Sequence, residues 1–178
     1  MNILTAGQPL CRSVTKSLSI TEGVNPYIFE HKGFIYKLET PRHFLFDGAS
    51  IPRLVWSILG LAPHGIMDGP GLPHDLIYQY RGVFPEGFYS IQSVDESWVP
   101  CTVPMPKATA DLLLRELVVY FKAAGRFKAF LIWSAVATFG GFAWHTDDVD
   151  RKSLILEHES LYHSYIDAMT DDAGKLIK

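Results

Sequence analysis

Aromatic and β-branched residues form two short runs near the start of the chain, over residues 27–29 and 34–36. Runs of this composition are typical of strands, and the His-Lys-Gly segment 31–33 between them supplies a turn. The pattern therefore predicts a β-hairpin, preceded by strand pieces and loop over residues 1–26. A third run, over residues 44–46, is expected to end the sheet.

The first helix signals follow this sheet. Ser50 has the character of a helix N-cap, because its hydroxyl group can accept a hydrogen bond from a backbone N–H of the first turn. A helix is therefore expected over residues 51–59, followed by a Gly- and Pro-rich loop over 61–72. Pro73 is expected to open the next helix, which carries His74.

The segment 83–106 is rich in proline, and we interpret it as an inserted flap, since long connections of this kind are usually functional. Within it, residues 88–91 and 98–99 have the composition of a small hairpin.

Apolar residues recur at helical spacing from Ala110 to Phe121, which predicts an amphipathic helix. The next segment, 127–144, is apolar almost all round and is expected to be a central, buried helix. Its apolar stretch is shorter than the ~20 residues that a membrane-spanning helix needs, so we expect no membrane span. Residues 147–178 show a second amphipathic pattern and offer a contact for a homo-oligomer.

Together these elements predict an α+β fold, with a small N-terminal antiparallel sheet packed on a mainly helical C-terminal half. Residues 1–146 are expected to form one globular domain that includes the flap, and residues 147–178 a C-terminal helical extension.

Composition narrows the class of protein. The chain has 178 residues, of which 48% are hydrophobic, enough for the core of one domain. A net charge of −3 without a basic run argues against nucleic acid as a partner, because binding phosphates needs clustered Lys and Arg. The two cysteines are compatible with a reducing cytoplasm, and we expect no signal peptide.

The candidate catalytic residues are His74, Tyr78 and Asp111. His74 and Tyr78 are four residues apart and share a helix face. Antiparallel packing of the two helices would bring Asp111 to the His74 ring. A carboxylate on one imidazole nitrogen fixes the tautomer and leaves the other nitrogen as a general base. Asp75, about 100° round the helix, is a candidate metal ligand. The same residues also suit a purely structural network.

Asp47 follows the third strand and precedes a helix N-terminus. It is a second candidate metal ligand, with Ser50 and Arg53 as candidate substrate-binding residues. Arg53 would bind a substrate carboxylate or phosphate. In the alternative interpretation, Asp47 caps backbone amides and pairs with Arg53, which ties the sheet to the helix.

Two motifs carry a family resemblance. The sequences Asp-Gly-Ala-Ser-Ile-Pro-Arg over residues 47–53 and His-Asp-Leu-Ile-Tyr over 74–78 resemble the motifs of domain-of-unknown-function family 1353, which is found mostly in bacteriophages and prophages. The helix that carries Asp111 fits the same pattern, and the resemblance covers residues 27–145. Phe46 departs from it, because the family usually has threonine there, so one hydroxyl group is missing. The resemblance implies a phage origin but no reaction, and it marks the flap and the C-terminal helix as additions.

A fainter similarity is to the core of secretory and viral phospholipases. By that similarity, His74 would activate a water, Asp75 would hold calcium, and Tyr78 and Asp111 would orient His74.

Two hypotheses remain open. In the first, the chain is a phage-encoded hydrolase whose site gathers His74, Asp111, Asp75 and Asp47, with calcium, magnesium or zinc as the metal that assists it. In the second, it is a non-enzymatic virion or tail component, or an inhibitor that binds a host protein, in the host cytoplasm or the virion. An open cleft around His74 would favour the enzyme, and a buried, mutually bonded cluster would favour the structural interpretation. Under the second hypothesis, a partner would contact exposed aromatic residues of the flap. These are Phe84, Phe88, Tyr89 and Trp98.

Overall fold

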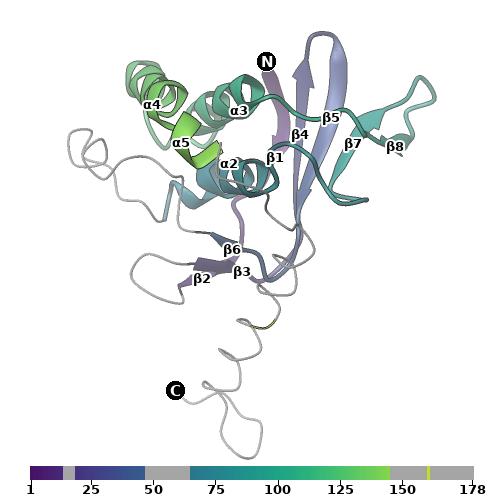
Figure 1. Cartoon of the computed structure of the whole chain (residues 1–178), viewed down its shortest axis with the longest axis horizontal. Coiled ribbons are helices and arrows are strands. Elements are labelled where there is room, and N and C mark those ends of the chain that lie inside the picture. Colours follow the sequence, from purple (N-terminus) through teal and green to yellow (C-terminus); the bar gives the residue numbers. More distant parts are fainter. Residues whose placement is uncertain (14–18, 47–64, 145–159, 161–178) are drawn as a thin grey trace, which may run out of the picture.

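The computed structural model describes residues 1–13, 19–46, 65–144 and 160, and within them the fold is α+β, as predicted. An antiparallel sheet occupies the N-terminal half and helices the C-terminal half (Figure 1). The strands are β1 (Asn2–Ala6), β2 (Cys11–Ser13), β3 (Ser19–Thr21), β4 (Asn25–His31), β5 (Phe34–Thr40), β6 (Leu45–Phe46), β7 (Tyr89–Gln92) and β8 (Trp98–Pro100). The helices are α2 (Asp68–Tyr80), α3 (Lys107–Tyr120), α4 (Arg126–Phe139) and α5 (Gly141–Trp144).

The predicted hairpin is confirmed and forms the centre of a five-stranded sheet with the order β1-β4-β5-β7-β8. Its two-residue turn places Lys32 at φ 53° and Gly33 at φ 79°, the left-handed conformations that a type I′ turn requires. Alternate side chains of β4 point into the core, among them Tyr27 and Phe29, as the period of two in a strand dictates.

The third predicted strand does not end this sheet. β6 pairs with β3 in a separate three-stranded sheet of order β2-β3-β6. The chain turns away after β5, with His43 at φ 64°. The Thr21 side chain holds this turn, because its hydroxyl donates to the carbonyl of Pro41 at 2.7 Å and accepts from the backbone N–H of Phe44 at 2.9 Å. These hydrogen bonds join residues far apart in the sequence and turn the chain away from the large sheet, so no local sequence pattern predicts the turn.

The hairpin predicted within 83–106 is confirmed, and it continues the large sheet because β7 pairs with β5. The expectation that the aromatic residues of this segment form an exposed surface is wrong. Tyr89 is buried, Phe84 and Phe88 pack against Tyr80 with ring centroids 6.4 and 5.9 Å away, and Trp98 is partly covered. Phe84, Phe88 and Tyr89 join the core cluster that contains Tyr80 of α2, where they bury apolar surface, whereas the Trp98 ring lies 5.2 Å from the ammonium of Lys37.

Helix α2 begins at Asp68, five residues before Pro73, where a loop was expected. A carboxylate oxygen of Asp68 accepts a hydrogen bond from the backbone N–H of Gly65 at 3.0 Å, which closes the turn that precedes α2. Gly69 is packed so closely that a Cβ there would lie 2.8 Å from the Gln8 side chain and 2.9 Å from the ring of Phe121. Tertiary packing therefore outweighs the poor helix propensity of this Gly- and Pro-containing turn.

Helices α2 and α3 run antiparallel. The backbone N–H of Met105, just before α3, donates to the carbonyl of Gly82, just after α2, at 2.8 Å. At the other end, Phe121 follows α3 and touches Gly69 in the first turn of α2. This direction places the middle of α2 against the first half of α3.

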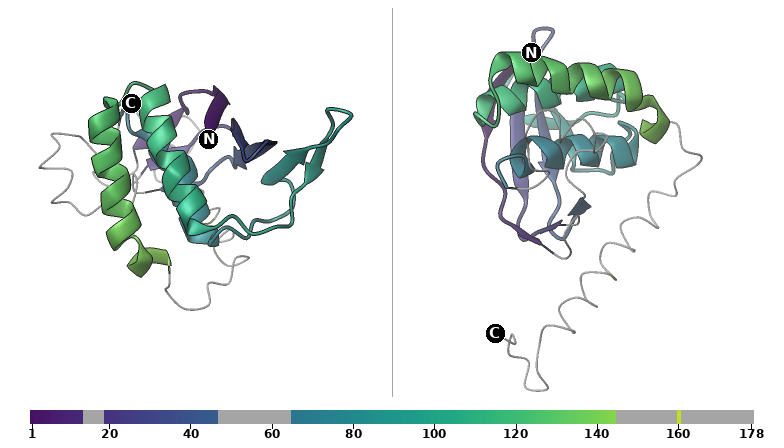
Figure 2. Two further views of the ribbon diagram at one scale, coloured as in Figure 1. Left: turned by 90° about the horizontal axis from the view of Figure 1, so that it is seen from above. Right: turned by 90° about the vertical axis from the view of Figure 1, so that its left-hand side faces the viewer.

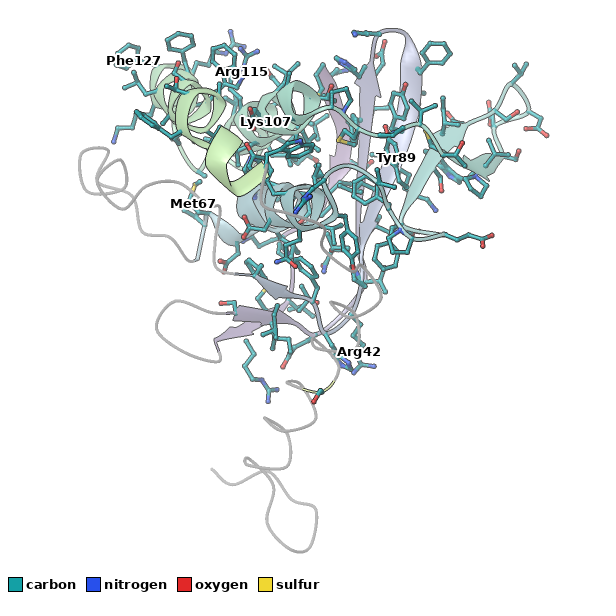
Figure 3. The ribbon with its side chains drawn as sticks, viewed as in Figure 1. Arg42, Met67, Tyr89, Lys107, Arg115 and Phe127 are labelled. Atoms are coloured by element: carbon teal, nitrogen blue, oxygen red, sulfur yellow. The ribbon has the colours of Figure 1, made fainter. Side chains whose placement is uncertain are left out.

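The amphipathic helix α3 is confirmed, but the prediction of a central, buried α4 is wrong. Helix α4 packs on α3 and lies farthest from the large sheet (Figure 2). Only one of its faces is buried, and Phe127, 73% exposed, lies at its outer end (Figure 3). A helix that is apolar on all faces is buried only when other elements cover every face. Among the described residues, no element covers the face of α4 that carries Phe127. No helix in the described part of the chain is long and apolar enough to cross a membrane.

Candidate functional site

The antiparallel pairing of α2 and α3 brings His74 and Asp111 together. The Nε2 atom of His74 lies 3.4 Å from Oδ1 of Asp111, although the residues are 37 positions apart. Both side chains are almost wholly buried, with 1% and 2% of the residue exposed. The distance suits an Nε2–H group that donates to the carboxylate, which is the contact that the sequence predicted if the helices were antiparallel.

Two further side chains hold the carboxylate of Asp111. The hydroxyl of Tyr78 donates to Oδ1 at 2.5 Å, and the ammonium of Lys107 donates to Oδ2 at 2.7 Å. Asp111 is therefore fixed by donors from both helices. Tyr78 is one of the candidate residues expected from the sequence, whereas Lys107 is not. The sequence does contain a signal for this contact, because Lys107 and Asp111 are four positions apart on one helix, which is the spacing of an intrahelical ion pair.

Lys107 also joins the third helix to the site. Its ammonium donates to the backbone carbonyls of Val136, at 2.9 Å, and Ala137, at 3.5 Å. Both carbonyls belong to the last turn of α4, where the helix dipole favours a positive charge. The network therefore ties α2, α3 and α4 together.

Aromatic rings enclose the site. The rings of His74 and Tyr78 are tilted by 35° with centroids 4.1 Å apart, and the rings of Tyr78 and Trp144 form a T-shaped pair with centroids 5.1 Å apart. Gly140 leaves room for this arrangement, because a Cβ there would lie 2.5 Å from the Tyr78 hydroxyl oxygen and 2.5 Å from the Val136 carbonyl oxygen. No motif in the sequence connects Trp144 or Gly140 with this site.

Asp75 lies on the other side of the imidazole ring. Its Oδ1 is 3.9 Å from Nδ1 of His74, beyond hydrogen-bond distance, and the Asp75 side chain is buried. Nδ1 itself is buried and has no hydrogen-bond partner among the residues that the structure describes. Within the described part of the chain, the ring is thus held at one nitrogen and has no partner at the other, with a carboxylate on each side.

These neighbours change the acid–base properties of the site. Burial alone would lower the pKa of His74, but the hydrogen bond with Asp111 and the negative charges of Asp75 and Asp111 outweigh it and raise that pKa above its ordinary value of 6.5. Burial would raise the pKa of Asp111, yet the donors His74, Lys107 and Tyr78 bring it below 3.8. Burial and the neighbouring Asp111 also raise the pKa of Tyr78. The site therefore favours a charged imidazole beside an ionised Asp111.

Three of the predicted site residues, Asp47, Ser50 and Arg53, lie outside the described residues, so their placement in the site stays a prediction. Among the residues with described positions, no group of three or more His, Cys, Asp or Glu side chains is arranged to hold a metal ion. Both oxygens of Asp111 already accept hydrogen bonds. A metal at this site would therefore depend on ligands such as Asp47.

The fold and the site together define an α+β domain with a buried His-Asp-Tyr-Lys network between its helices. A family model described as a protein of unknown function, DUF1353, matches residues 23–136, well over half of the chain. The chain belongs to this family, and the match runs through α2, α3 and the hairpin β7–β8. No curated protein and no solved structure matches the chain.

Proposed function

We propose that the chain is a phage-encoded hydrolase in which His74 is the general base. One observation carries the proposal: Asp111 holds the ring at Nε2, while the buried Nδ1 has no hydrogen-bond partner in the described part of the chain. A buried polar atom without a partner is rare in a folded protein and needs an explanation. A base that acts through Nδ1 supplies one.

The surroundings of the ring suit proton abstraction. With Nε2–H donating to Asp111, the lone pair of a neutral His74 is on Nδ1 and can accept a proton from a water molecule. The resulting imidazolium is stabilised by the carboxylates of Asp111 and Asp75, which already raise the pKa of His74. Lys107 and Tyr78 act as positioning residues, because they fix the two oxygens of Asp111.

Burial limits what can reach this base. Since His74 is only 1% exposed, the group that meets Nδ1 must be about the size of a water molecule. Hydrolysis uses a nucleophile of this size, water, and the scissile bond of the substrate must then come within about 3.5 Å of that water.

The test compares His74→Gln with the wild-type chain on three scissile bonds: a nitrophenyl carboxylic ester, a nitrophenyl phosphodiester and a peptide nitroanilide. The amide nitrogen of Gln can take the place of Nε2 and donate to Asp111, so this variant keeps the structural contact and removes the base. We expect hydrolysis of one bond class by the wild type and a loss of at least about 100-fold in the variant.

Lys122→Gln, a change at an exposed residue after α3, is the control and should keep the wild-type rate. Thermal unfolding of all three proteins shows whether the fold is intact. Hydrolysis that is equal in wild type and His74→Gln, or no hydrolysis of any of the three bonds by the wild type, would contradict the proposal.

A non-enzymatic phage protein, either a virion or tail component or an inhibitor of a host protein, is the second candidate. Burial of the His74 network and its contacts with three helices favour this alternative, since both also suit a purely structural role. Under it, His74→Gln would leave every measured activity unchanged. The binding partner would then be a phage or host protein, met in the virion or the host cytoplasm.

A further inference from the structure

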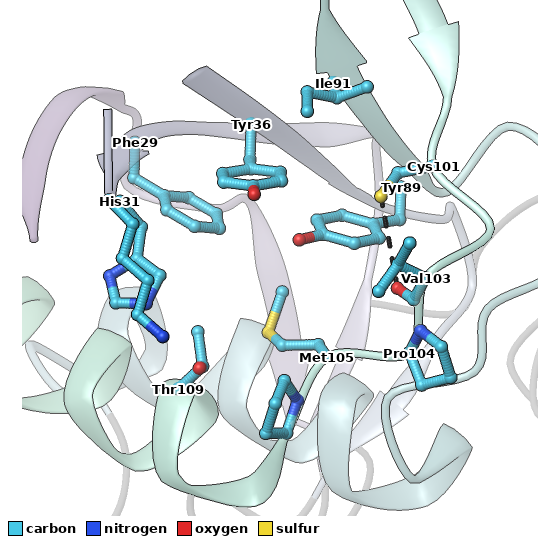
Figure 4. Close-up of a pocket in the computed structure, with 12 residues that line it drawn as sticks. Phe29, His31, Tyr36, Tyr89, Ile91, Cys101, Val103, Pro104, Met105 and Thr109 are labelled. Atoms are coloured by element: carbon cyan, nitrogen blue, oxygen red, sulfur yellow. Dashed lines mark hydrogen bonds between the residues drawn. The ribbon is translucent and has the colours of Figure 1, made fainter. Parts of the chain in front are cut away.

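A cavity of about 210 Å³ lies between the large sheet and the start of α3 (Figure 4). His74, Tyr78 and Asp111 are not among its lining residues, so it is separate from the network described above. Two walls of the cavity are apolar and one end is polar, and this combination suits a ligand that has both an apolar and a polar part.

One wall is a row of aromatic rings on neighbouring strands. Tyr36 stacks on Phe29 on one side and on Tyr89 on the other, with centroids 5.6 Å apart in both pairs and planes inclined by 25° and 13°. The Met105 side chain faces this row from the opposite wall (Figure 4). A flat apolar group fits between an aromatic row and a methionine, because both surfaces favour contact with a ring.

The end of the cavity near Phe29 is polar and positive. His31, Lys32 and Thr109 line it, and Figure 4 shows His31 and Thr109 on the same side of the cavity. Thr109 lies in the first turn of α3, a 14-residue helix whose N-terminus favours negative charge. Burial and the nearby charge of Lys32 lower the pKa of His31, which leaves Lys32 as the main positive charge. No acidic residue is among the described residues that line the cavity.

We propose that this cavity binds a small aromatic carboxylate, with its ring against Tyr36 and Phe29 and its carboxylate towards Lys32 and Thr109. The size agrees, since a cavity of roughly 150 Å³ holds benzene. A volume of 210 Å³ therefore accommodates one ring with a short acidic side chain. Aromatic faces also attract cations, but the positive charge of Lys32 disfavours a cation here, since no carboxylate is among the described lining residues.

The experiment titrates the full chain with phenylacetate, and with 2-phenylethanol and phenethylamine as neutral and cationic analogues, by calorimetry and saturation-transfer NMR. We expect saturable binding of phenylacetate and at least about tenfold weaker binding of the other two compounds. Lys32→Gln should weaken phenylacetate binding about fivefold, as the loss of one exposed charge predicts. Thr109→Phe, which fills the polar end, should abolish binding.

Lys122→Gln is the matched control, because Lys122 has nearly the same left-handed backbone, φ 56° against 53°, and does not line the cavity. It should bind phenylacetate like the wild type. Equal affinity for all three compounds, an unchanged affinity in Lys32→Gln, or no saturable binding of phenylacetate would each overturn the proposal. None of these results depends on whether His74 is catalytic.

Discussion

The Tyr78 hydroxyl group and the Asp111 carboxylate are joined by a 2.5 Å hydrogen bond in the interior of the protein, across the interface of α2 and α3. The oxygen that accepts it, Oδ1, is also the one nearest to Nε2 of His74. The second oxygen is held by Lys107. Asp111 is therefore the residue on which the whole network depends.

Replacing Asp111 with Asn should destabilise the fold by about 3 kcal/mol, because removal of one member of a buried charged network leaves the others uncompensated. Urea unfolding followed by circular dichroism measures this loss. Asp95→Asn is the control: Asp95 is an exposed hairpin residue, bonded to Ser97, and its replacement should leave the urea midpoint close to that of the wild type. An Asp111→Asn midpoint as high as that of the control would show that the network contributes little to stability.

Gly140→Ala should destabilise the fold by about 2 kcal/mol, since the added methyl group meets the Tyr78 hydroxyl and the Val136 carbonyl at 2.5 Å. The next residue provides a matched control, because a Cβ on Gly141 would meet nothing within 4 Å. Thermal unfolding of the two alanine variants should therefore separate them by several degrees. Similar melting temperatures would mean that the site does not pack tightly around Gly140.

An NMR titration of the imidazole nitrogens should give His74 a pKa above 6.5, because the two flanking carboxylates favour its charged form more than burial disfavours it. Above that pKa, the neutral ring should carry its proton on Nε2, facing Asp111. In Asp111→Asn the pKa of His74 should fall, since one of the two negative charges is gone. A neutral ring with its proton on Nδ1 would exclude Nδ1 as the base.

Stability should depend on pH in a predictable direction. The raised pKa of His74 contributes stability that is fully present below its ordinary value of 6.5 and is lost as the pH rises through the raised pKa. The lowered pKa of Asp111 contributes stability that is fully present above 3.8 and is lost as the pH falls through the lowered pKa.

The network should thus contribute most between pH 3.8 and 6.5. Urea midpoints measured from pH 3 to 9 check this, with His74→Gln as the reference. The difference between wild type and this variant should shrink at the alkaline end. A difference that instead grows with pH would show that burial, and not the carboxylates, determines the pKa of His74.

Local patterns in the sequence were sufficient for the hairpin β4–β5, the hairpin β7–β8 and the helix α3. In each case neighbouring residues supply the cause: alternating or helical spacing of apolar side chains, and a turn with Gly33 after Lys32. The approach of Asp111 to His74 was expected only on the condition that the two helices pack antiparallel, because the sequence places the acid at the edge of the apolar stripe of its helix.

Only the tertiary structure decided the other features. The turn that contains Gly69 is helical because Phe121 and Gln8 pack on it, and Leu45 joins a second sheet because Thr21 holds the preceding turn. α4 lies on the outside because nothing described covers its Phe127 face, and the rings of Phe29, Tyr36 and Tyr89 form one cavity wall because three strands place them side by side. Each of these depends on residues far apart in the chain, so the free energy that determines it comes from contacts that no short stretch of sequence contains.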